Sequence, residues 1–380
     1  MYQLSFSLNQ FLTQYWQKQP TIIKGGFTDF QDPITPEELA GLTMEEEIDS
    51  RFVSNLNGEW TAEHGPFNDA KFDGLNDSHW SFIVQAANHW HSGVAELVEP
   101  FKALPNWLFD DLMISYSVQH GGVGPHIDQY DVFIIQGMGK RHWRVGAKDI
   151  GQYTDNHSVN GLKQIESFSA IIDDVLEPGD ILYIPPGFPH DGYALEPSMS
   201  YSAGFRSPKE QELISNFADY ILAHDIGDVH MHNPALATQD GFGEISDSDL
   251  NTLTNMLIKS LDNKSTIDDF MGCLLSQSRH QLNIIPAEPT WDMDEIANHL
   301  HSGLRFEKVA GLRSLYHQNS ENTVYINGEV FQIPVNQTKL TRALCNQELL
   351  YIEQLENALD SQAVNLIQDL VNKGYWYAKE

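Results

Sequence analysis

The sequence is poor in cysteine and in basic residues, and it contains no long apolar run. Cys273 and Cys345 are its only cysteines, lying 72 residues apart with no partner at the spacing of a zinc site, so we expect free thiols in a reducing cytoplasm. No stretch approaches the roughly 20 apolar residues that span a membrane. The opening residues, MYQLSF, lack the basic stretch and apolar run of a secretion signal. These absences predict a soluble cytoplasmic protein without a membrane partner.

The shortage of basic residues constrains the partner. The 380 residues include 22 Lys and Arg against 53 Asp and Glu, which gives a formal net charge of −31. Proteins that bind nucleic acid neutralise its phosphates with Lys and Arg, so we expect no direct nucleic-acid binding. An acidic protein attracts basic polypeptides, which favours a substrate rich in Arg and Lys. An organism whose proteins are generally acidic would give the same charge, and the sequence leaves that alternative open.

Three side chains have the spacing and the chemistry of a metal site. His126 and Asp128 are separated by one residue, so in a strand both point to the same side, although a His-x-Asp pair alone is weak evidence. His190 follows 62 residues after Asp128, beyond an apolar strand expected at 181–184 and a Pro-Pro-Gly corner at 185–187 that presents it. Two imidazoles and one carboxylate on one face of a metal are the ligands of non-heme Fe(II) oxygenases. The sequence therefore predicts that His126, Asp128 and His190 bind the metal and carry catalysis.

The central part of the chain resembles a known family. Residues 111–208 resemble a JmjC-type double-stranded β-helix oxygenase, and YDVFIIQG at 130–137 with KRHWRV at 140–145 resembles the bacterial ribosomal oxygenases. The similarity extends from residues 11–20 to residues 374–376. It implies a hydroxylase that depends on Fe(II), 2-oxoglutarate and O₂ and acts on an arginine of large-subunit ribosomal protein sixteen. It also implies a homodimer, formed through a helical region.

An oxygenase of this kind needs a buried cation to hold the far carboxylate of 2-oxoglutarate. The family places this residue fifteen positions after the first metal histidine, which is Arg141 here, and a guanidinium suits a carboxylate because it binds both oxygens. The segment 137–140 predicts a hairpin that folds the strand 141–145 back beside the strand 131–136. The resemblance also places a hydroxyl for the co-substrate at Ser117, although a small polar residue in a strand serves equally well as packing.

Neighbours of Arg141 compete for the same role. Lys140, His142 and Arg144 are the competing side chains. Alternation along a strand puts Arg141 and Trp143 on one face and His142 and Arg144 on the other. The large apolar ring of Trp143 argues that the first face points into the barrel.

The order of the expected elements indicates an α+β protein. We expect a double-stranded β-helix domain over residues 1–207, a helical dimerisation region over 208–286 and a winged-helix-like domain over 287–380. Apolar spacing and turn residues predict helices over 210–224, 249–261, 347–359 and 361–373, and a hairpin of strands 323–326 and 329–333 around Asn327-Gly328.

For two groups of polar residues the sequence is compatible with either a functional or a structural role. His224, Asp225, Asp228, His230 and His232 have the composition of a metal cluster but fit a polar loop better, because a stronger ligand set lies elsewhere. Tyr130 and Asp131 lie near the predicted metal, where they would either grip a substrate guanidinium or pack at the barrel rim.

Three functions are compatible with the sequence. The first is hydroxylation of a ribosomal protein arginine. The second is the same chemistry on another protein, for example on histidine, or on a small molecule. The third is a metal-containing cupin sensor with a regulatory winged helix. A sensor needs no carboxylate clamp, and residues 281–380 carry 7 Lys or Arg against 13 Asp or Glu, so Arg141 and the acidic C-terminal part both weigh against the third.

Overall fold

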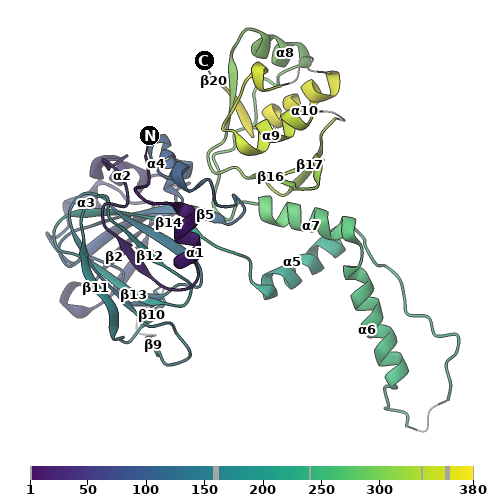
Figure 1. Cartoon of the computed structure of the whole chain (residues 1–380), viewed down its shortest axis with the longest axis horizontal. Helices are drawn as coiled ribbons and strands as arrows, with labels where there is room; N and C mark the ends of the chain where they lie inside the picture. The colour runs from purple at the N-terminus through teal and green to yellow at the C-terminus, as the bar shows by residue number, and fades with distance from the viewer. Residues whose placement is uncertain (1, 157–161, 239–240, 335–336, 356–359, 380) are drawn as a thin grey trace.

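A computed structural model describes residues 2–156, 162–238, 241–334, 337–355 and 360–379. Figure 1 shows three parts in chain order, namely a β-rich N-terminal part, a projecting arm of helices, and a C-terminal part that mixes helices with short strands. This arrangement confirms the α+β class. Within the described residues, no helix combines the length and the apolar content needed to cross a bilayer.

The N-terminal part consists mainly of strands. They are β1 (Thr21–Ile23), β2 (Ser50–Ser54), β3 (Thr61–His64), β4 (Trp80–Val84), β5 (Phe109–Ser117), β6 (His126–Ile127), β7 (Asp131–Gln136), β8 (Arg141–Gly146), β9 (Asp155–Asn156), β10 (Gln164–Ile165), β11 (Ala170–Leu176), β12 (Ile181–Ile184), β13 (Pro189–Ala194) and β14 (Ser198–Phe205). Helical segments are α1 (Leu8–Gln14), α2 (Pro36–Leu42), α3 (Asp69–Asp73), α4 (Ser92–Glu96), η1 (Leu56–Gly58), η2 (Ala87–His89) and η3 (Glu99–Phe101).

These strands form two sheets that face each other. The larger sheet has eight strands in the order β1-β12-β7-β14-β5-β4-β2-β3, and the smaller has six in the order β11-β8-β13-β6-β10-β9. Successive strands from β5 to β8, and again from β11 to β14, alternate between the two sheets. This alternation is the topology of the predicted double-stranded β-helix.

Strand β7 is apolar along its whole length because both of its faces are covered. Val132 and Ile134 pack between the two sheets with Trp143. Phe133 points to the other side, where its ring lies 5.1 Å from that of Phe11 in α1. The larger sheet is therefore closed off by the N-terminal helix on one face and borders the barrel interior with the other.

The predicted hairpin between 131–136 and 141–145 is wrong. β7 pairs with β12 and β14 in the larger sheet, whereas β8 pairs with β11 and β13 in the smaller one. Both edges of β7 are already hydrogen-bonded, so β8 has no free edge to join. The connecting segment first follows β14, where the Met199 amide donates to the Met138 carbonyl over 2.9 Å, and then crosses to the opposite sheet.

The arm contains α5 (Glu210–Ala223), α6 (Asp247–Leu261) and α7 (Lys264–Ser276). In Figure 1, α6 projects away from both other parts, whereas α7 packs against the C-terminal part. The first two helices confirm the predictions over 210–224 and 249–261; the third was not predicted. The side chains of Leu250, Leu253, Leu257 and Leu261 recur at helical spacing along α6 and are exposed.

The C-terminal part packs helices on two small sheets. Its elements are α8 (Met293–His301), β15 (Arg305–Lys308), β16 (Ser314–His317), β17 (Ser320–Ile326), β18 (Glu329–Gln332), α9 (Thr338–Asn346), β19 (Leu349–Leu350), η4 (Ile352–Gln354), α10 (Ser361–Asn372) and β20 (Trp376–Lys379). The hairpin of β17 and β18 is confirmed, with Asn327 and Gly328 both at positive φ, 49° and 85°. The helix over 361–373 is confirmed as α10.

The predicted helix over 347–359 is wrong for the residues that the structure describes. Leu350 pairs with Phe306 of β15, so the segment is recruited as a short strand. Residues 356–359 lie outside the described residues. A helix that was not predicted, α9, occupies 338–346 instead.

Candidate metal and co-substrate site

The three predicted metal ligands lie together at one end of the barrel. His126 in β6 and His190 in β13 are cross-strand partners, and Asp128 follows β6 by one residue. The Asp128 Oδ2 atom lies 3.8 Å from His126 Nε2 and 3.7 Å from His190 Nε2. One ligand atom from each residue falls within 4.8 Å of the others. Three atoms at this spacing can contact one ion.

Hydrogen bonds aim both imidazoles at the same point. His126 Nδ1 lies 2.8 Å from the Gly124 carbonyl, and His190 Nδ1 lies 3.1 Å from the Phe188 carbonyl. Because a carbonyl only accepts, each Nδ1 carries the proton and donates it. The Nε2 lone pair of each ring is then free for a metal, the second-sphere arrangement typical of ligating histidines.

The electrostatics of the cluster also suit a divalent cation. Burial lowers the pKa of His190 to about 4, an effect that His126 reinforces, so this ring is neutral at pH 7. The hydroxyl of Tyr130 is hydrogen-bonded to Asp128, and burial together with that carboxylate raises the pKa of Tyr130. The donor set of two imidazoles with free Nε2 atoms and one partly buried carboxylate fits Fe(II).

The Pro-Pro-Gly corner has a different task from the predicted one. His190 lies inside β13 and is placed by that strand, not by the corner. Gly187 in the corner has φ +82°, and its amide donates to the Asp128 carbonyl over 2.7 Å. The corner therefore fixes the backbone of Asp128, the predicted carboxylate ligand, while strand pairing fixes the two histidines.

Arg141 is a buried cation inside the barrel. Its side chain and that of Trp143 are buried on one face of β8, whereas His142 and Arg144 on the other face are partly exposed, which confirms the predicted alternation. Burial lowers the pKa of Arg141 to about 9. Among the described residues, no carboxylate lies within salt-bridge distance of this guanidinium. A buried charge without a counter-ion is costly, and an anionic ligand such as a carboxylate would relieve that cost.

The guanidinium is held by two serines that the sequence reasoning missed. Arg141 donates from Nε to Ser198 Oγ over 3.0 Å and from Nη1 to Ser115 Oγ over 2.7 Å. Nη2 donates to the Ser115 carbonyl over 2.7 Å and to the Ser198 carbonyl over 3.1 Å. Ser115 shares a face of β5 with Ser117, so strand alternation was the available signal for it. Ser198 lies 57 residues from Arg141, and no sequence signal links the two residues.

Ser117 lies one pleat further along β5 and is fully buried. Its hydroxyl is 2.6 Å from that of Ser81 in β4. Its predicted contact with the co-substrate stays a prediction.

The competitors of Arg141 all have acidic partners near the surface. Lys140 Nζ lies 2.5 Å from Glu177, and His142 Nε2 lies 2.7 Å from Asp173. Arg144 also approaches Asp173, at 3.7 Å. Of these four basic side chains, Arg141 has the surroundings of a carboxylate clamp.

Asp131 points away from the metal. Its carboxylate accepts from Tyr183 over 2.5 Å and from Gln17 over 2.9 Å. These contacts tie β7 to β12 and to the segment after α1, which is the packing interpretation of Asp131.

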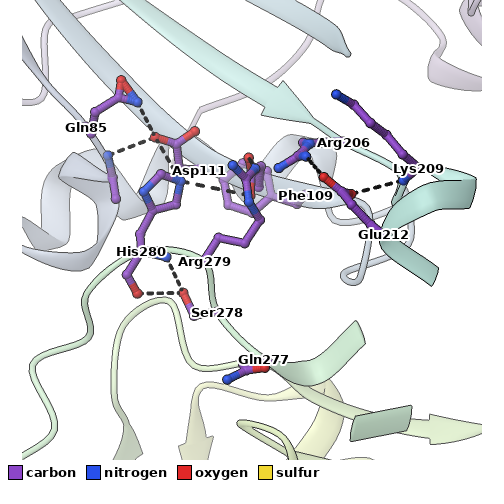
Figure 2. Close-up of polar contacts among 12 residues, drawn as sticks. Gln85, Phe109, Asp111, Arg206, Lys209, Glu212, Gln277, Ser278, Arg279 and His280 are labelled. Carbon is purple, nitrogen blue, oxygen red and sulfur yellow. Dashed lines mark hydrogen bonds and ion pairs between the residues drawn. The ribbon is translucent and has the colours of Figure 1, made fainter. Parts of the chain in front are cut away.

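A second group of ligand-type side chains lies at the junction with the C-terminal part, where Asp110, Asp111 and His280 come within 4.8 Å of one another. Figure 2 shows His280 beside Asp111, with Arg279 next to it on the connector after α7. Arg279 is ion-paired with Asp110, and Arg313 Nη2 lies 3.6 Å from the same carboxylate. Two guanidinium groups already balance the negative charge, so we interpret this group as an ion-pair junction.

Backbone contacts complete the junction. Arg313 Nη2 donates to the Phe109 carbonyl over 2.5 Å, and His89 Nδ1 donates to the Gln281 carbonyl over 2.9 Å. Burial lowers the pKa of His89 to about 4. The predicted loop residues His224, Asp225, Asp228, His230 and His232 are exposed, and the described part of the chain gives them no place in a metal-binding group.

The chain matches known proteins along its length. The JmjC domain family matches residues 96–213, and the ROXA-like winged helix family matches residues 259–377. The ribosomal protein uL16 3-hydroxylase of Escherichia coli is 46% identical over 378 residues, 99% of each chain. A bifunctional lysine-specific demethylase and histidyl-hydroxylase of Brugia malayi is 37% identical over 83 residues, 19% of this chain and 11% of that protein.

A solved structure shows the same fold in complex with a metal and 2-oxoglutarate. The ribosomal oxygenase of E. coli in complex with cobalt and 2-oxoglutarate has a TM-score of 0.92 and 45% identity, covering 100% of both chains. The JmjC-domain ribosomal oxygenases use Fe(II), 2-oxoglutarate and O₂. This chain belongs to that family and is a 2-oxoglutarate-dependent oxygenase.

Proposed function

We propose that this protein hydroxylates an arginine side chain of a large-subunit ribosomal protein of the uL16 class. The observation that carries the proposal is the 46% identity to a uL16 hydroxylase over 99% of both chains. Because the match extends through the arm and the C-terminal part, it includes surfaces beyond the metal site that would contact a protein substrate.

In this proposal His126, Asp128 and His190 hold Fe(II), and Arg141 holds the distal carboxylate of 2-oxoglutarate, with Ser117 as a further contact. When bound, the metal and co-substrate use O₂ to convert 2-oxoglutarate to succinate and CO₂ and to place one oxygen atom in a substrate C–H bond. The chain orients both imidazoles, neutralises the distal carboxylate, and encloses the co-substrate between two sheets.

The protein surface supports a basic partner. The formal charge of −31 attracts an Arg- and Lys-rich polypeptide over a distance set by the ionic strength. The similarity of one segment to a histidyl-hydroxylase supports a second candidate, hydroxylation of histidine by the same site. Family membership in the oxygenases removes the sensor alternative.

The test is incubation with Fe(II), 2-oxoglutarate, O₂ and purified uL16, followed by intact and tandem mass spectrometry. We expect succinate release coupled to gain of one oxygen atom on an arginine. A basic ribosomal protein of similar charge is the matched control and should not be modified. Modification on a histidine would favour the second candidate, and no modification of any ribosomal protein would refute the proposal.

We also propose that the arm forms a homodimer interface. The leucine stripe of α6 is exposed, and apolar stripes of this kind are normally buried against another surface. Light scattering should show a dimer that Leu257→Glu weakens, whereas Asn255→Glu, an exposed change on the same helix, should not. A monomeric parent protein would refute the interface.

The proposal also covers the domain organisation, the compartment and the partner of the C-terminal part. We place the domain boundaries at 207/208 and 286/287, the site of action in the cytoplasm, and the acidic C-terminal part in contact with protein instead of nucleic acid. Limited proteolysis tests the domain boundaries. An electrophoretic shift assay with ribosomal RNA tests whether the C-terminal part binds nucleic acid.

A further inference from the structure

The interior of the barrel contains a buried hydrogen-bond donor without an acceptor. Trp143 is 8% exposed, and within the described part of the chain its indole Nε1 is fully covered and has no hydrogen-bond partner. Buried indole N–H groups usually find an acceptor, because leaving one unpaired costs the desolvation of that group. Such a group points to an acceptor supplied by something other than the chain.

Trp143 occupies the path between the metal ligands and the clamp. On β8, Arg141, Trp143 and Val145 share the inner face, and their cross-strand partners on β13 are Ala194, Gly192 and His190. Four residues of strand span roughly 13 Å. A ligand that contacts the metal at the His190 end and Arg141 at the other therefore passes Trp143, the midpoint of this face.

The surroundings of the indole fix its position. A Cβ on Gly192 would lie 2.6 Å from the Trp143 ring, so the ring lies directly against this glycine. The ring centroid is 6.4 Å from that of His190, with an angle of 36° between the planes. Val132 and Ile134 from the opposite sheet complete the contact. The indole is therefore held between the two sheets.

The clamp itself leaves the carboxylate short of donors. A guanidinium has five N–H donors, and the hydrogen bonds of Arg141 to Ser115 and Ser198 use four of them. One N–H remains for a carboxylate that can accept about four hydrogen bonds. The hydroxyls of Ser115 and Ser198, which accept from Arg141, have their own protons to donate. Trp143 Nε1 is a further buried donor on the same face of β8.

We propose that the Trp143 indole N–H donates a hydrogen bond to the distal carboxylate of bound 2-oxoglutarate, beside Arg141. The proposal rests on Arg141 as the clamp and assigns the neighbouring donor. Trp143 then positions the co-substrate as well as filling the barrel, and it discriminates for ligands that carry a second carboxylate.

The test compares two buried tryptophans. Trp143→Phe removes the N–H and keeps an aromatic ring; Trp80→Phe is the matched control, because Trp80 is also 8% exposed but already donates to the Asn76 carbonyl. Calorimetric titration of cobalt-loaded protein should show the Kd of 2-oxoglutarate raised about tenfold in Trp143→Phe, or about 1.4 kcal/mol, and changed less than about twofold in Trp80→Phe.

Ligands separate a hydrogen bond from loss of packing. Succinate retains the distal carboxylate, so its affinity for Trp143→Phe should fall in parallel with that of 2-oxoglutarate. Pyruvate, an oxo acid without that carboxylate, should bind the unaltered protein and Trp143→Phe with equal affinity. Equal weakening of pyruvate would assign the effect to packing and overturn the proposal, as would an unchanged Kd for 2-oxoglutarate. If Arg141→Ala also leaves that Kd unchanged, the clamp assignment fails instead.

A second measurement uses the protein with Trp143 intact, so it tests the proposal even if the Trp143→Phe variant does not fold. In zinc-loaded, ¹⁵N-labelled protein, the indole N–H signal of Trp143 is assigned by elimination with Phe variants of the other seven tryptophans. Addition of 2-oxoglutarate should move this signal to higher frequency and slow its exchange with solvent. A signal that does not respond would overturn the proposal.

Discussion

Replacing Arg141 with alanine should separate co-substrate binding from stability. The guanidinium is buried and has no acidic partner among the residues that the structure describes, so its full charge is available to the distal carboxylate of 2-oxoglutarate. Loss of a charge-assisted pair in a water-poor pocket costs about 2 to 4 kcal/mol. The Kd for 2-oxoglutarate should therefore rise roughly thirtyfold or more.

The ligand-free protein should respond in the opposite sense. Burial lowers the pKa of Arg141 from its ordinary 12.5 to about 9, which corresponds to a cost of about 5 kcal/mol for keeping this charge in the barrel. Alanine removes that cost but also the four hydrogen bonds to Ser115 and Ser198. We expect a melting temperature that is unchanged or higher without ligand, and that no longer rises when 2-oxoglutarate is added.

Calorimetric titration and thermal unfolding, with metal content checked in each variant, measure both effects. Arg141→Lys should recover part of the affinity, because the charge returns without the two-pronged geometry. An unchanged Kd in Arg141→Ala, with the defect appearing in Arg144→Ala or Lys140→Ala, would refute the assignment of the clamp.

Three further outcomes are expected. Asp128→Ala should abolish turnover and weaken iron binding while circular dichroism stays native, since it removes the anionic ligand from a partly exposed position; full activity with verified iron would exclude Asp128 from the site. Burial lowers the pKa of His89 from its ordinary 6.5 to about 4, so the unfolded chain takes up this proton first. The free energy of unfolding should fall as the pH drops from about 6.5 to 4, by about 3 kcal/mol from this residue, and His89→Gln should show a shallower loss in thermal unfolding scans. Raising the ionic strength from about 0.05 to 0.5 M should lower kcat/KM for the basic substrate more than kcat, and a flat profile would mean that the charge of −31 does not steer encounter.

Local sequence was sufficient to place His126 and Asp128 together and to identify the inward face of β8. His126 and Asp128 are two residues apart on one segment, and the alternation of Arg141, His142 and Trp143 needs only the geometry of a single strand. These inferences use periodicities that do not depend on which strand lies alongside.

Strand partners and long-range contacts were not accessible in this way. The sequence at 131–145 looks like a hairpin, yet the chain crosses between sheets because β12 and β14 occupy both edges of β7. The apolar spacing at 347–359 predicts a helix, but Leu350 instead pairs with β15 as a short strand. Ser198 reaches Arg141 only because β14 and β8 face each other across the barrel.

The nine residues of strand β5 connect the junction with the C-terminal part to the Arg141 site in the barrel. Its first residues, Phe109 and Asp110, contact Arg313 of the C-terminal part. Further along the strand, Ser115 accepts a hydrogen bond from the Arg141 guanidinium in the barrel. A fragment truncated after the arm would lose Arg313 and leave Asp110 without one of its two cations. Loss of co-substrate affinity in such a fragment would thus report a displaced strand, and it would not by itself show that the winged helix touches the substrate.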